Sequence, residues 1–265
     1  MLPEDEARVS AFDHGFIVGD GVFETLRTYG GQPFAVGRHL RRLARSAEGL
    51  GLPAPDPARV AGAIDAVLGA AGLPEARVRI TVTSGPGPLG SARGSSGPTV
   101  MVAVAPIDPL PATATVVTVP WARNERGALT GLKTTSYAEN AVALARAHQA
   151  GADEAVFANT AGALCEGTGT NVAVAVGGRF VTPPLTSGCL AGVTRSLLLE
   201  ASGVVEESVP LSVLADAEEA ALLSSTRGVQ PIASVDGRPL PAAPGPLTRR
   251  AAEAFAALVA AGLDP

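Results

Sequence analysis

The chain reads GLKTTSYAEN over residues 131–140 and LCEGTGTN over residues 164–171. The first stretch contributes an amine at Lys133, and the second contributes a carboxylate at Glu166. A third stretch, LAGVTR at residues 190–195, predicts the start of a helix. An amine that can hold an aldehyde, a carboxylate that can pair with a ring nitrogen and a helix start that can hold a phosphate are the three groups that pyridoxal phosphate needs.

The first half of the chain predicts a small α+β domain, because alternating and helical apolar patterns follow one another. Strands are expected at residues 8–12, 22–29, 77–83 and 99–104, and helices at residues 36–50 and 57–71. Residues 84–98 are rich in Gly, Ser and Pro and predict a loop, and residues 106–111 predict a hinge.

The second half predicts a larger domain that is rich in strands. Strands are expected at residues 116–119, 154–158, 171–176 and 219–224, and helices at residues 137–150, 194–201 and 247–263. We therefore expect a small N-terminal α+β domain at residues 1–110, a linker with the first strand at 111–130, and a large cofactor-binding domain at 131–265.

Composition excludes several classes of function. The 265 residues are 46% hydrophobic, which suffices for a large core, and the net charge of -5 argues against nucleic acid or an anionic membrane as a partner. No apolar run approaches the ~18 residues of a membrane span, and the acidic start does not resemble a signal peptide. Cys165 and Cys189 lack a CxxC spacing, so we expect no metal site, no disulfide framework and a cytoplasmic location.

Lys133 and Glu166 each have an ordinary alternative. A lone lysine is usually a solvated surface group, whereas a lysine that forms a Schiff base must be kept largely neutral by burial or by a nearby cation. A glutamate before Gly167 is a common turn residue. In the functional interpretation, the Glu166 carboxylate keeps a pyridine nitrogen protonated, so that the ring accepts electrons from the substrate Cα.

The candidate phosphate site also has ordinary alternatives. Val193 and Thr194 open a predicted helix whose backbone N–H groups can bind a dianion, although a Thr that only caps the helix is far commoner. Arg42 can bind phosphate with two hydrogen bonds, or it can belong to a basic helix face. Ser225 and Thr226 follow a predicted strand and can add hydroxyl groups, or they can form a plain turn.

Taken together, these motifs resemble the class IV aminotransferase family, also called fold type IV of the pyridoxal-phosphate enzymes. This family includes branched-chain aminotransferases, D-amino-acid aminotransferases, (R)-amine transaminases and 4-amino-4-deoxychorismate lyases. The resemblance extends from FDHG at residues 12–15 and GDGVFET at residues 19–25 to the C-terminal helix. Its most specific blocks are LKT at 132–134, GADEA at 151–155, Glu166-Gly167 with Asn171, TPP at 182–184 and GVTR at 192–195.

The resemblance implies a mixed α+β fold, in which a small N-terminal α+β domain precedes a larger β-barrel-like domain with flanking helices. It implies that Lys133 forms the Schiff base and moves protons, that Glu166 contacts the pyridine nitrogen, and that Leu190 packs against the ring. The cofactor would be pyridoxal 5'-phosphate, with the pyridoxamine 5'-phosphate form in turnover, and the protein would be a homodimer with shared active sites. The implied phosphate contacts are Arg42, Val193, Thr194 and Ser225. One departure is visible, since the short strand that usually precedes a segment like residues 8–10 is absent or cut down.

The motifs that separate members of the family are incomplete in this chain. D-amino-acid aminotransferases of the best-known type carry an arginine where this chain has Ser84 and a tyrosine where it has Phe23. The loop at residues 87–91 reads GPLGS, without the arginine and tyrosine of enterobacterial-type lyases. The residues after the lysine, TTSY at 134–137, replace the GGNY that is usual in branched-chain enzymes.

Three arginines remain as candidates for binding a substrate carboxylate: Arg27, Arg79 and Arg227. A guanidinium can bind a carboxylate through two parallel hydrogen bonds, and an ordinary strand charge is the alternative for each. We hypothesise that Arg27, from the partner subunit, and Arg227 take the place of the missing arginine. For Arg79 the two interpretations are balanced, and Tyr137 is a further candidate for contact with the substrate.

The sequence therefore predicts a pyridoxal-phosphate transaminase that uses D-amino acids and α-keto acids in a ping-pong mechanism. The first alternative is 4-amino-4-deoxychorismate lyase, which eliminates pyruvate to give 4-aminobenzoate, because the Lys-Thr-x-Ser-Tyr-Ala-x-Asn pattern also occurs in lyase-like relatives. A branched-chain L-amino-acid transaminase is the next alternative. A non-catalytic binding protein that kept the fold is disfavoured by the intact lysine, glutamate and phosphate motifs.

Overall fold

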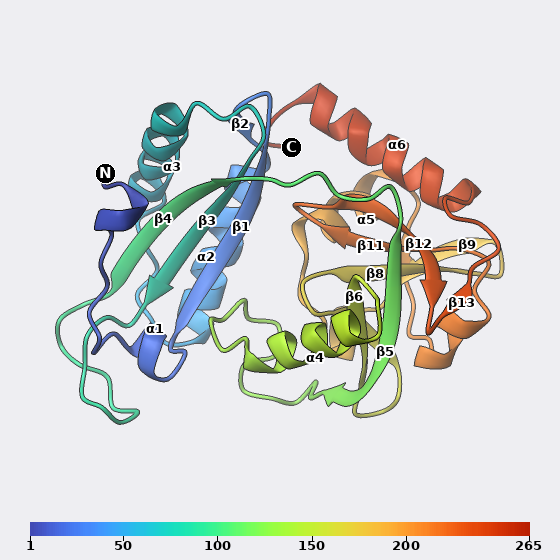
Figure 1. Ribbon diagram of the computed structural model, residues 1–265, viewed down its shortest axis with the longest axis horizontal. Coiled ribbons are helices and arrows are strands. Elements are labelled where there is room, and N and C mark those ends of the chain that lie inside the picture. The colour runs from blue at the N-terminus through green and yellow to red at the C-terminus, as the bar shows by residue number, and fades with distance from the viewer. The chain divides into compact units, whose positions relative to one another are not determined.

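A four-stranded sheet in the order β2-β1-β3-β4 forms the centre of the first of two units in the computed structural model, which describes residues 1–265. This unit comprises residues 1–108, 132–137 and 263–265. Figure 1 labels its elements, which are η1 (Glu4–Glu6), α1 (His14–Ile17), β1 (Gly21–Tyr29), β2 (Gln32–Pro33), α2 (Val36–Gly49), α3 (Pro57–Ala71), β3 (Ala76–Thr83) and β4 (Thr99–Pro106).

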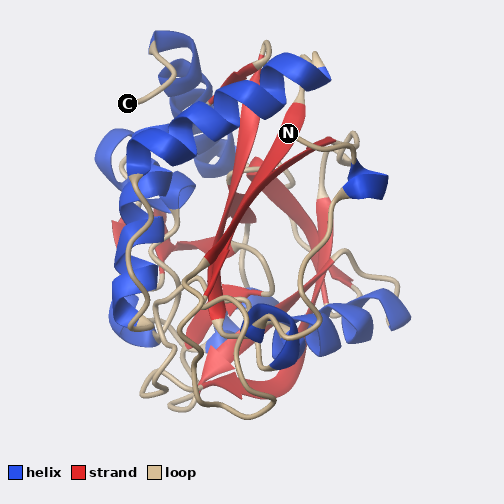
Figure 2. Cartoon of the chain, turned by 90° about the vertical axis from the view of Figure 1, so that its left-hand side faces the viewer, coloured by secondary structure: helices blue, strands red, loops and turns tan.

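Alternation along β3 decides which face of this sheet is covered. Val78, Ile80 and Val82 are fully buried and belong to one core with Leu43 of α2 and Ile64 of α3. Because successive side chains of a strand point to opposite faces, the odd-numbered residues of β3 lie on the face away from these helices. In Figure 2, which faces this unit, the long helices lie along one side of the red strands.

The register of the sheet places aromatic and cationic side chains together on the other face. β1 and β3 are antiparallel, with Phe23 opposite Thr81 and Thr25 opposite Arg79. These four residues therefore share the face that α2 and α3 leave uncovered. Phe23 and Arg79 are thus brought together by strand pairing, although 56 positions separate them in the sequence.

A mixed sheet of nine strands forms the second unit, which comprises residues 109–131 and 138–262. Its strand order is β10-β9-β8-β11-β12-β5-β6-β7, and β13 pairs with β12. The strands are β5 (Ala114–Arg123), β6 (Glu154–Asn159), β7 (Leu164–Gly167), β8 (Asn171–Val176), β9 (Arg179–Thr182), β10 (Val205–Glu206), β11 (Ala220–Ser224), β12 (Gly228–Val235) and β13 (Arg238–Pro239). The helices are α4 (Ala138–Gln149), η2 (Leu185–Ser187), α5 (Val193–Ala201), η3 (Leu211–Ala215) and α6 (Pro246–Ala261).

The units differ from the expected domain boundaries at two places. Residues 132–137 were expected in the large domain, but they belong to the first unit because their backbone pairs with β1. Phe23 N–H donates to the Lys133 carbonyl at 2.9 Å, and Thr135 N–H donates to the Gly21 carbonyl at 2.8 Å. Residues 263–265 also belong to the first unit, after α6 has ended in the second.

One expected strand was wrong, and several strands of the structure were not predicted, of which β12 is the longest. Residues 8–12 form no strand; they are exposed, and Asp13 N–H donates to the Ser10 carbonyl in a turn. The strand β12 was not predicted, because it contains Pro231, which cannot donate a ladder hydrogen bond and is rare in the interior of a sheet. An irregularity of register between Ile232 and Ser234 follows this proline. None of the helices has the length and apolar character that crossing a membrane requires.

Candidate active site

Lys133 is fixed through its backbone on both sides. Its carbonyl accepts the hydrogen bond from Phe23 of β1, and its own N–H donates to Ser46 Oγ of α2 at 3.2 Å. The side chain is half-buried, and its Nζ lies 4.4 Å from the centre of the Phe23 ring and 5.9 Å from the centre of the Tyr137 ring. Lys133 is also the only lysine of the chain. The amine is therefore held in an aromatic environment by contacts that do not depend on its own side chain.

Arg79 lies on the same aromatic ring as Lys133. Its Cζ is 3.4 Å from the centre of Phe23, and its Nε donates to Thr81 Oγ1 at 3.3 Å. Burial lowers the pKa of the Arg79 guanidinium, because desolvation disfavours its charge. No acidic side chain of the first unit lies within ion-pair distance of Arg79. A half-buried guanidinium of this kind is suited to bind the carboxylate of a ligand.

Tyr137 completes this cluster. Its ring packs edge-to-face against Phe23, with the ring centres 5.2 Å apart and the ring planes at 79°. Such pairs are favourable because the edge of one ring carries positive potential and the face of the other carries negative potential. The structure thus brings together three of the residues that the sequence singled out, Lys133, Arg79 and Tyr137, around Phe23.

Arg42 is buried in an ion pair within the first unit. Its Nε and Nη2 donate to the two carboxylate oxygens of Glu24, each at 2.7 Å, and His39 Nδ1 is 2.7 Å from the same carboxylate. Burial alone would raise the pKa of Glu24, but the charge and hydrogen bonds of Arg42, with His39, lower it to about 2. Burial lowers the pKa of His39, which favours the neutral imidazole. The Glu24 carboxylate therefore fixes the orientation of Arg42, and the predicted phosphate contact of Arg42 stays a prediction.

The other two arginines have partners of their own. Arg27 donates from Nε and Nη2 to Glu75 at 3.0 and 2.9 Å, and its guanidinium lies over the ring of Tyr29. Arg227 belongs to the second unit, where its side chain donates to Gln230. Their predicted role in binding a substrate carboxylate is not tested by these contacts. Arg27 has the acidic partner Glu75, whereas Arg227, like Arg79, forms no ion pair and donates to a neutral side chain.

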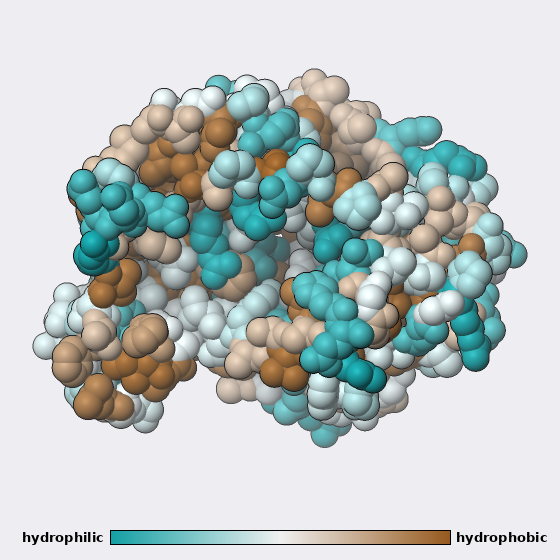
Figure 3. Space-filling model, in the orientation of Figure 1, coloured by the Kyte–Doolittle hydropathy of each residue, from teal (hydrophilic) through white to brown (hydrophobic).

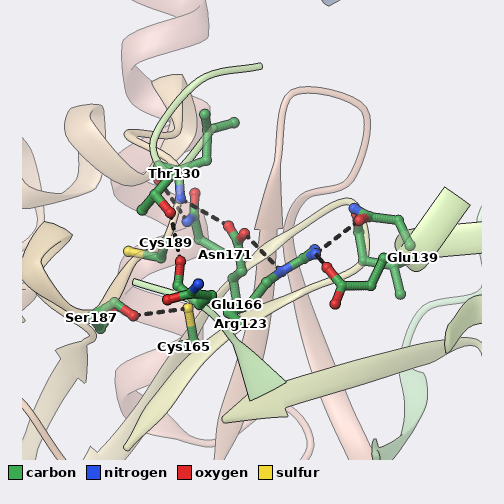
Figure 4. Close-up of polar contacts among 12 residues, drawn as sticks. Arg123, Thr130, Glu139, Cys165, Glu166, Asn171, Ser187 and Cys189 are labelled. Atoms are coloured by element: carbon green, nitrogen blue, oxygen red, sulfur yellow. Dashed lines mark hydrogen bonds and ion pairs between the residues drawn. The ribbon is translucent and has the colours of Figure 1, made fainter. Parts of the chain in front are cut away.

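Glu166 is held as a carboxylate in the second unit. Leu190 N–H donates to Oε2 at 2.9 Å, and Arg123 Nε forms an ion pair with Oε1 at 3.4 Å. Figure 4 shows Arg123 between Glu166 and Glu139, to which it also donates at 2.8 Å. The Arg123 guanidinium lies 4.1 Å from the centre of the Phe157 ring. Arg123 was not singled out from the sequence, because it carries no local motif and reaches Glu166 only through the pairing of β5, β6 and β7.

The peptide of Leu190 is fixed from both ends. Its N–H donates to Glu166, and its carbonyl accepts from Asn171 Nδ2 at 2.9 Å. The turn between Glu166 and Asn171 is in turn fastened by Glu154, which accepts from the backbone and the hydroxyl of Thr168. Leu190 and Glu166 are therefore held in one fixed arrangement, as a ring-binding site requires.

The start of α5 provides unpaired backbone N–H groups. The helix begins at Val193, with Gly192 as its cap and no side-chain cap, so Thr194 is not the N-cap that the alternative interpretation supposed. A Cβ on Gly192 would lie 1.9 Å from Asn171 Oδ1, which explains the glycine. Ser225 and Thr226 follow β11, against which α5 packs.

The donor set fits pyridoxal phosphate chemically. One amine, a carboxylate held by Leu190 N–H and Arg123, and an uncapped helix start with the hydroxyl groups that follow β11 match the aldehyde, the ring nitrogen and the phosphate of that group. Lys133 and Arg42 belong to the first unit, and Glu166, Leu190 and the start of α5 belong to the second.

Residues 21–235 match the family model described as amino-transferase class IV. The chain belongs to this family. The match confirms the resemblance inferred from the sequence. The class IV aminotransferases are pyridoxal-phosphate enzymes.

Relatives cover nearly the whole chain. It is 30% identical over 258 residues to a D-alanine aminotransferase of Bacillus licheniformis, and the alignment covers 94% of this chain and 91% of the relative. It is 31% identical over 279 residues to a bifunctional aminodeoxychorismate lyase / D-amino acid transaminase of Mycobacterium tuberculosis, with 96% and 92% covered. The crystal structure of the branched-chain amino acid aminotransferase of Escherichia coli superposes with a TM-score of 0.91 at 25% identity, covering 97% and 91%. The fold is that of the fold type IV aminotransferases, as the sequence predicted.

Proposed function

We propose that this class IV aminotransferase moves an amino group between a D-amino acid and an α-keto acid in a ping-pong sequence. The observation that carries the proposal is the position of Arg79, a guanidinium without an acidic partner, on the same Phe23 ring as the amine of Lys133. A substrate with a carboxylate beside its amine-bearing carbon matches that pair of groups. The relatives named as D-amino-acid transaminases support the D-configuration.

The residues of this chain would divide the work as follows. Bound pyridoxal phosphate supplies an aldehyde that takes up the amino group and a ring that accepts electrons from the substrate Cα. Lys133 Nζ would remove the proton from that carbon and return it on the cofactor side, because its amine is the basic group that the cluster around Phe23 offers. Glu166 would hold a proton at the ring nitrogen, and Arg123 and Leu190 N–H orient the Glu166 carboxylate.

The remaining residues bind and orient. Arg79 would bind the substrate carboxylate, and Tyr137 would pack beside it. The start of α5 at Val193 and Thr194, the hydroxyl groups of Ser225 and Thr226, and the guanidinium of Arg42 would bind the phosphate. Leu190 would pack against the ring, since Glu166 and Asn171 fix its peptide.

We further propose that the protein is a homodimer. Four large apolar side chains near α1 and in the loop at residues 84–98 are exposed: Phe12, Phe16, Val18 and Leu89. Figure 3 shows brown surface at the end of the first unit where α1 lies in Figure 1. Exposed apolar clusters mark interaction surfaces, and a second copy is the occupant that the family resemblance favours. Light scattering should give twice the chain mass of 26.5 kDa, and Phe16→Glu should shift it toward the monomer. A monomeric wild-type protein would refute this.

The test of the reaction uses the loaded enzyme and D-alanine without any keto acid. We expect the cofactor absorption to change to that of the pyridoxamine form, with release of one pyruvate per site. L-alanine is the matched comparison and should react much more slowly. If D-alanine leaves the spectrum unchanged while aminodeoxychorismate yields pyruvate and 4-aminobenzoate, the enzyme is a lyase. If only L-leucine reacts, it is a branched-chain enzyme.

Variants at Arg79 test how the substrate is bound. Arg79→Gln should raise the KM for D-alanine and pyruvate by about 10- to 100-fold, because a charge-assisted hydrogen-bonded pair contributes roughly 1.5–3 kcal/mol. The KM for a neutral amine such as 1-phenylethylamine should change by less than about threefold. Arg77→Gln is the matched control, since Arg77 is an exposed arginine on the same strand and face. Arg27→Gln and Arg227→Gln, assayed in parallel, decide between the three arginines. An equal effect on both kinds of substrate would contradict the role of Arg79.

A further inference from the structure

The helix α2 begins without a side-chain cap of its own. Its N-cap residue is Ala35, which makes no side-chain hydrogen bond and has a left-handed backbone with φ of 57°. That conformation is strained for a residue with a Cβ, so the surrounding structure must hold it in place. The N–H groups of the first helical turn also need acceptors from outside the helix.

Residues 263–265, which we call the clasp, provide those acceptors. Ala35 N–H donates to the Leu263 carbonyl, and Gly37 N–H donates to Asp264 Oδ1 at 2.8 Å. Arg38 Nε donates to the Pro265 carbonyl at 2.8 Å. Asp264 therefore does for α2 what the side chain of an N-cap Asp or Asn does for other helices, although 227 positions separate it from Gly37. Its negative charge at a helix N-terminus is itself favourable.

Gly37 makes room for the Asp264 carboxylate. A Cβ at position 37 would lie 2.7 Å from Asp264 Oδ2 and 3.2 Å from Oδ1. The backbone of Gly37 is helical, so no unusual conformation requires glycine there. The glycine is thus explained by the close approach of the clasp.

One face of α2 carries three residues of the candidate active site. His39 and Arg42 contact the Glu24 carboxylate, and Ser46 accepts the N–H of Lys133. Arg42 lies five residues after Gly37, which is about 7.5 Å along a helix axis. A loosened first turn would therefore reach His39 and Arg42 before it reached Ser46.

We propose that Asp264 is a positioning residue for Arg42. By capping α2, the clasp holds the first two turns of the helix, and with them the guanidinium that binds the cofactor phosphate. The inference rests on the phosphate role given to Arg42 under the proposed function. Asp264 would then raise the affinity for the cofactor without contacting the cofactor itself.

The experiment compares pyridoxal phosphate with pyridoxal, which lacks the phosphate, in titrations of the full-length apoprotein followed by absorbance. Asp264→Ala should weaken the binding of pyridoxal phosphate by about 3- to 10-fold, which is the usual effect of losing a helix cap. It should weaken the binding of pyridoxal by less than about twofold. Asp264→Asn keeps the acceptor and should restore the affinity. Leu263→Ala keeps the backbone carbonyl of the clasp and is the matched control. Gly37→Ala should reproduce Asp264→Ala, and the double variant should be no worse than either single one.

Amide hydrogen exchange provides a readout without cofactor. In Asp264→Ala, the amides of residues 39–42 should exchange faster than in Asp264→Asn. Equal weakening of both cofactors, or unchanged exchange, would overturn the proposal. Arg42→Lys separates the premise from the inference. If Arg42→Lys weakens the binding of pyridoxal phosphate and of pyridoxal equally, Arg42 does not bind the phosphate, and the proposal fails. Faster amide exchange in Asp264→Ala would then show only that the clasp caps the helix.

Discussion

Replacement of Lys133 with alanine is expected to lower kcat by at least about 10³-fold, because it removes both the covalent attachment and the general base. The fold should persist, since the hydrogen bonds of Lys133 with Ser46 and Phe23 are made by its backbone. Borohydride treatment of the wild-type enzyme should add one cofactor mass to the chain. Because Lys133 is the only lysine, the N-terminus is the only other amine of the chain that the label could modify.

The control for Lys133→Ala is Tyr137→Phe, which keeps the ring that packs against Phe23. That variant should still take the label and keep a thermal midpoint close to that of the wild type. Label on a peptide other than the one with residue 133, or activity within tenfold of the wild type in Lys133→Ala, would remove Lys133 from its role.

Replacement of Glu24 with alanine is expected to destabilise the protein by about 3–5 kcal/mol, because it leaves the buried guanidinium of Arg42 without its partner. Glu24→Gln keeps the shape and should be milder, so it serves if the alanine variant does not fold. Urea unfolding at pH 7 measures both. Glu75→Gln is the matched control, since the Arg27–Glu75 pair is partly exposed and should contribute less than about 1 kcal/mol.

The same carboxylate should make stability depend on acid pH. The pKa of Glu24 is lowered from 4.5 in the unfolded chain to about 2 in the folded protein. Its contribution is therefore fully present above about pH 5 and is lost as the pH falls from there toward 2, amounting to roughly 3 kcal/mol by linkage. Glu24→Gln should lack this part of the acid dependence. If Glu24→Gln lost as much stability between pH 5 and pH 3 as the wild type, the contribution of the Glu24–Arg42 ion pair would be contradicted.

Motifs made of neighbouring residues were predictable from the sequence, whereas partners distant along the chain were not. Lys133, Glu166 and the start of α5 each lie in a short block with its own chemistry, and the family followed from their combination. Arg123 reaches Glu166 only after three strands pair, and Asp264 reaches Gly37 only after the whole chain has folded. No local pattern announces such contacts, because the energy of each depends on a neighbour that the sequence does not identify.

Arg79 illustrates the middle case. The alternation of β3 predicts that Arg79 and Ile80 face opposite sides, with the apolar Ile80 toward the helices, but the sequence does not say which residues of β1 lie beside Arg79. The pairing of β3 with β1 settles this by placing Arg79 beside Phe23. The same need for tertiary context explains the missed strand β12, where the pairing with β11 and β5 outweighs the poor strand propensity of Pro231.

The assignment of residues 132–137 and 263–265 to the first unit has a consequence for how this protein can be divided. The chain passes between the units four times, after residues 108, 131, 137 and 262. No single cut in the gene can therefore yield either unit as a continuous fragment, and a fragment that ends near residue 110 would lack both the segment with Lys133 and the clasp on α2. Recombination with a relative would have to exchange the three segments of the first unit together. The two units therefore cannot be separated by a single exchange of sequence, although each has a core of its own.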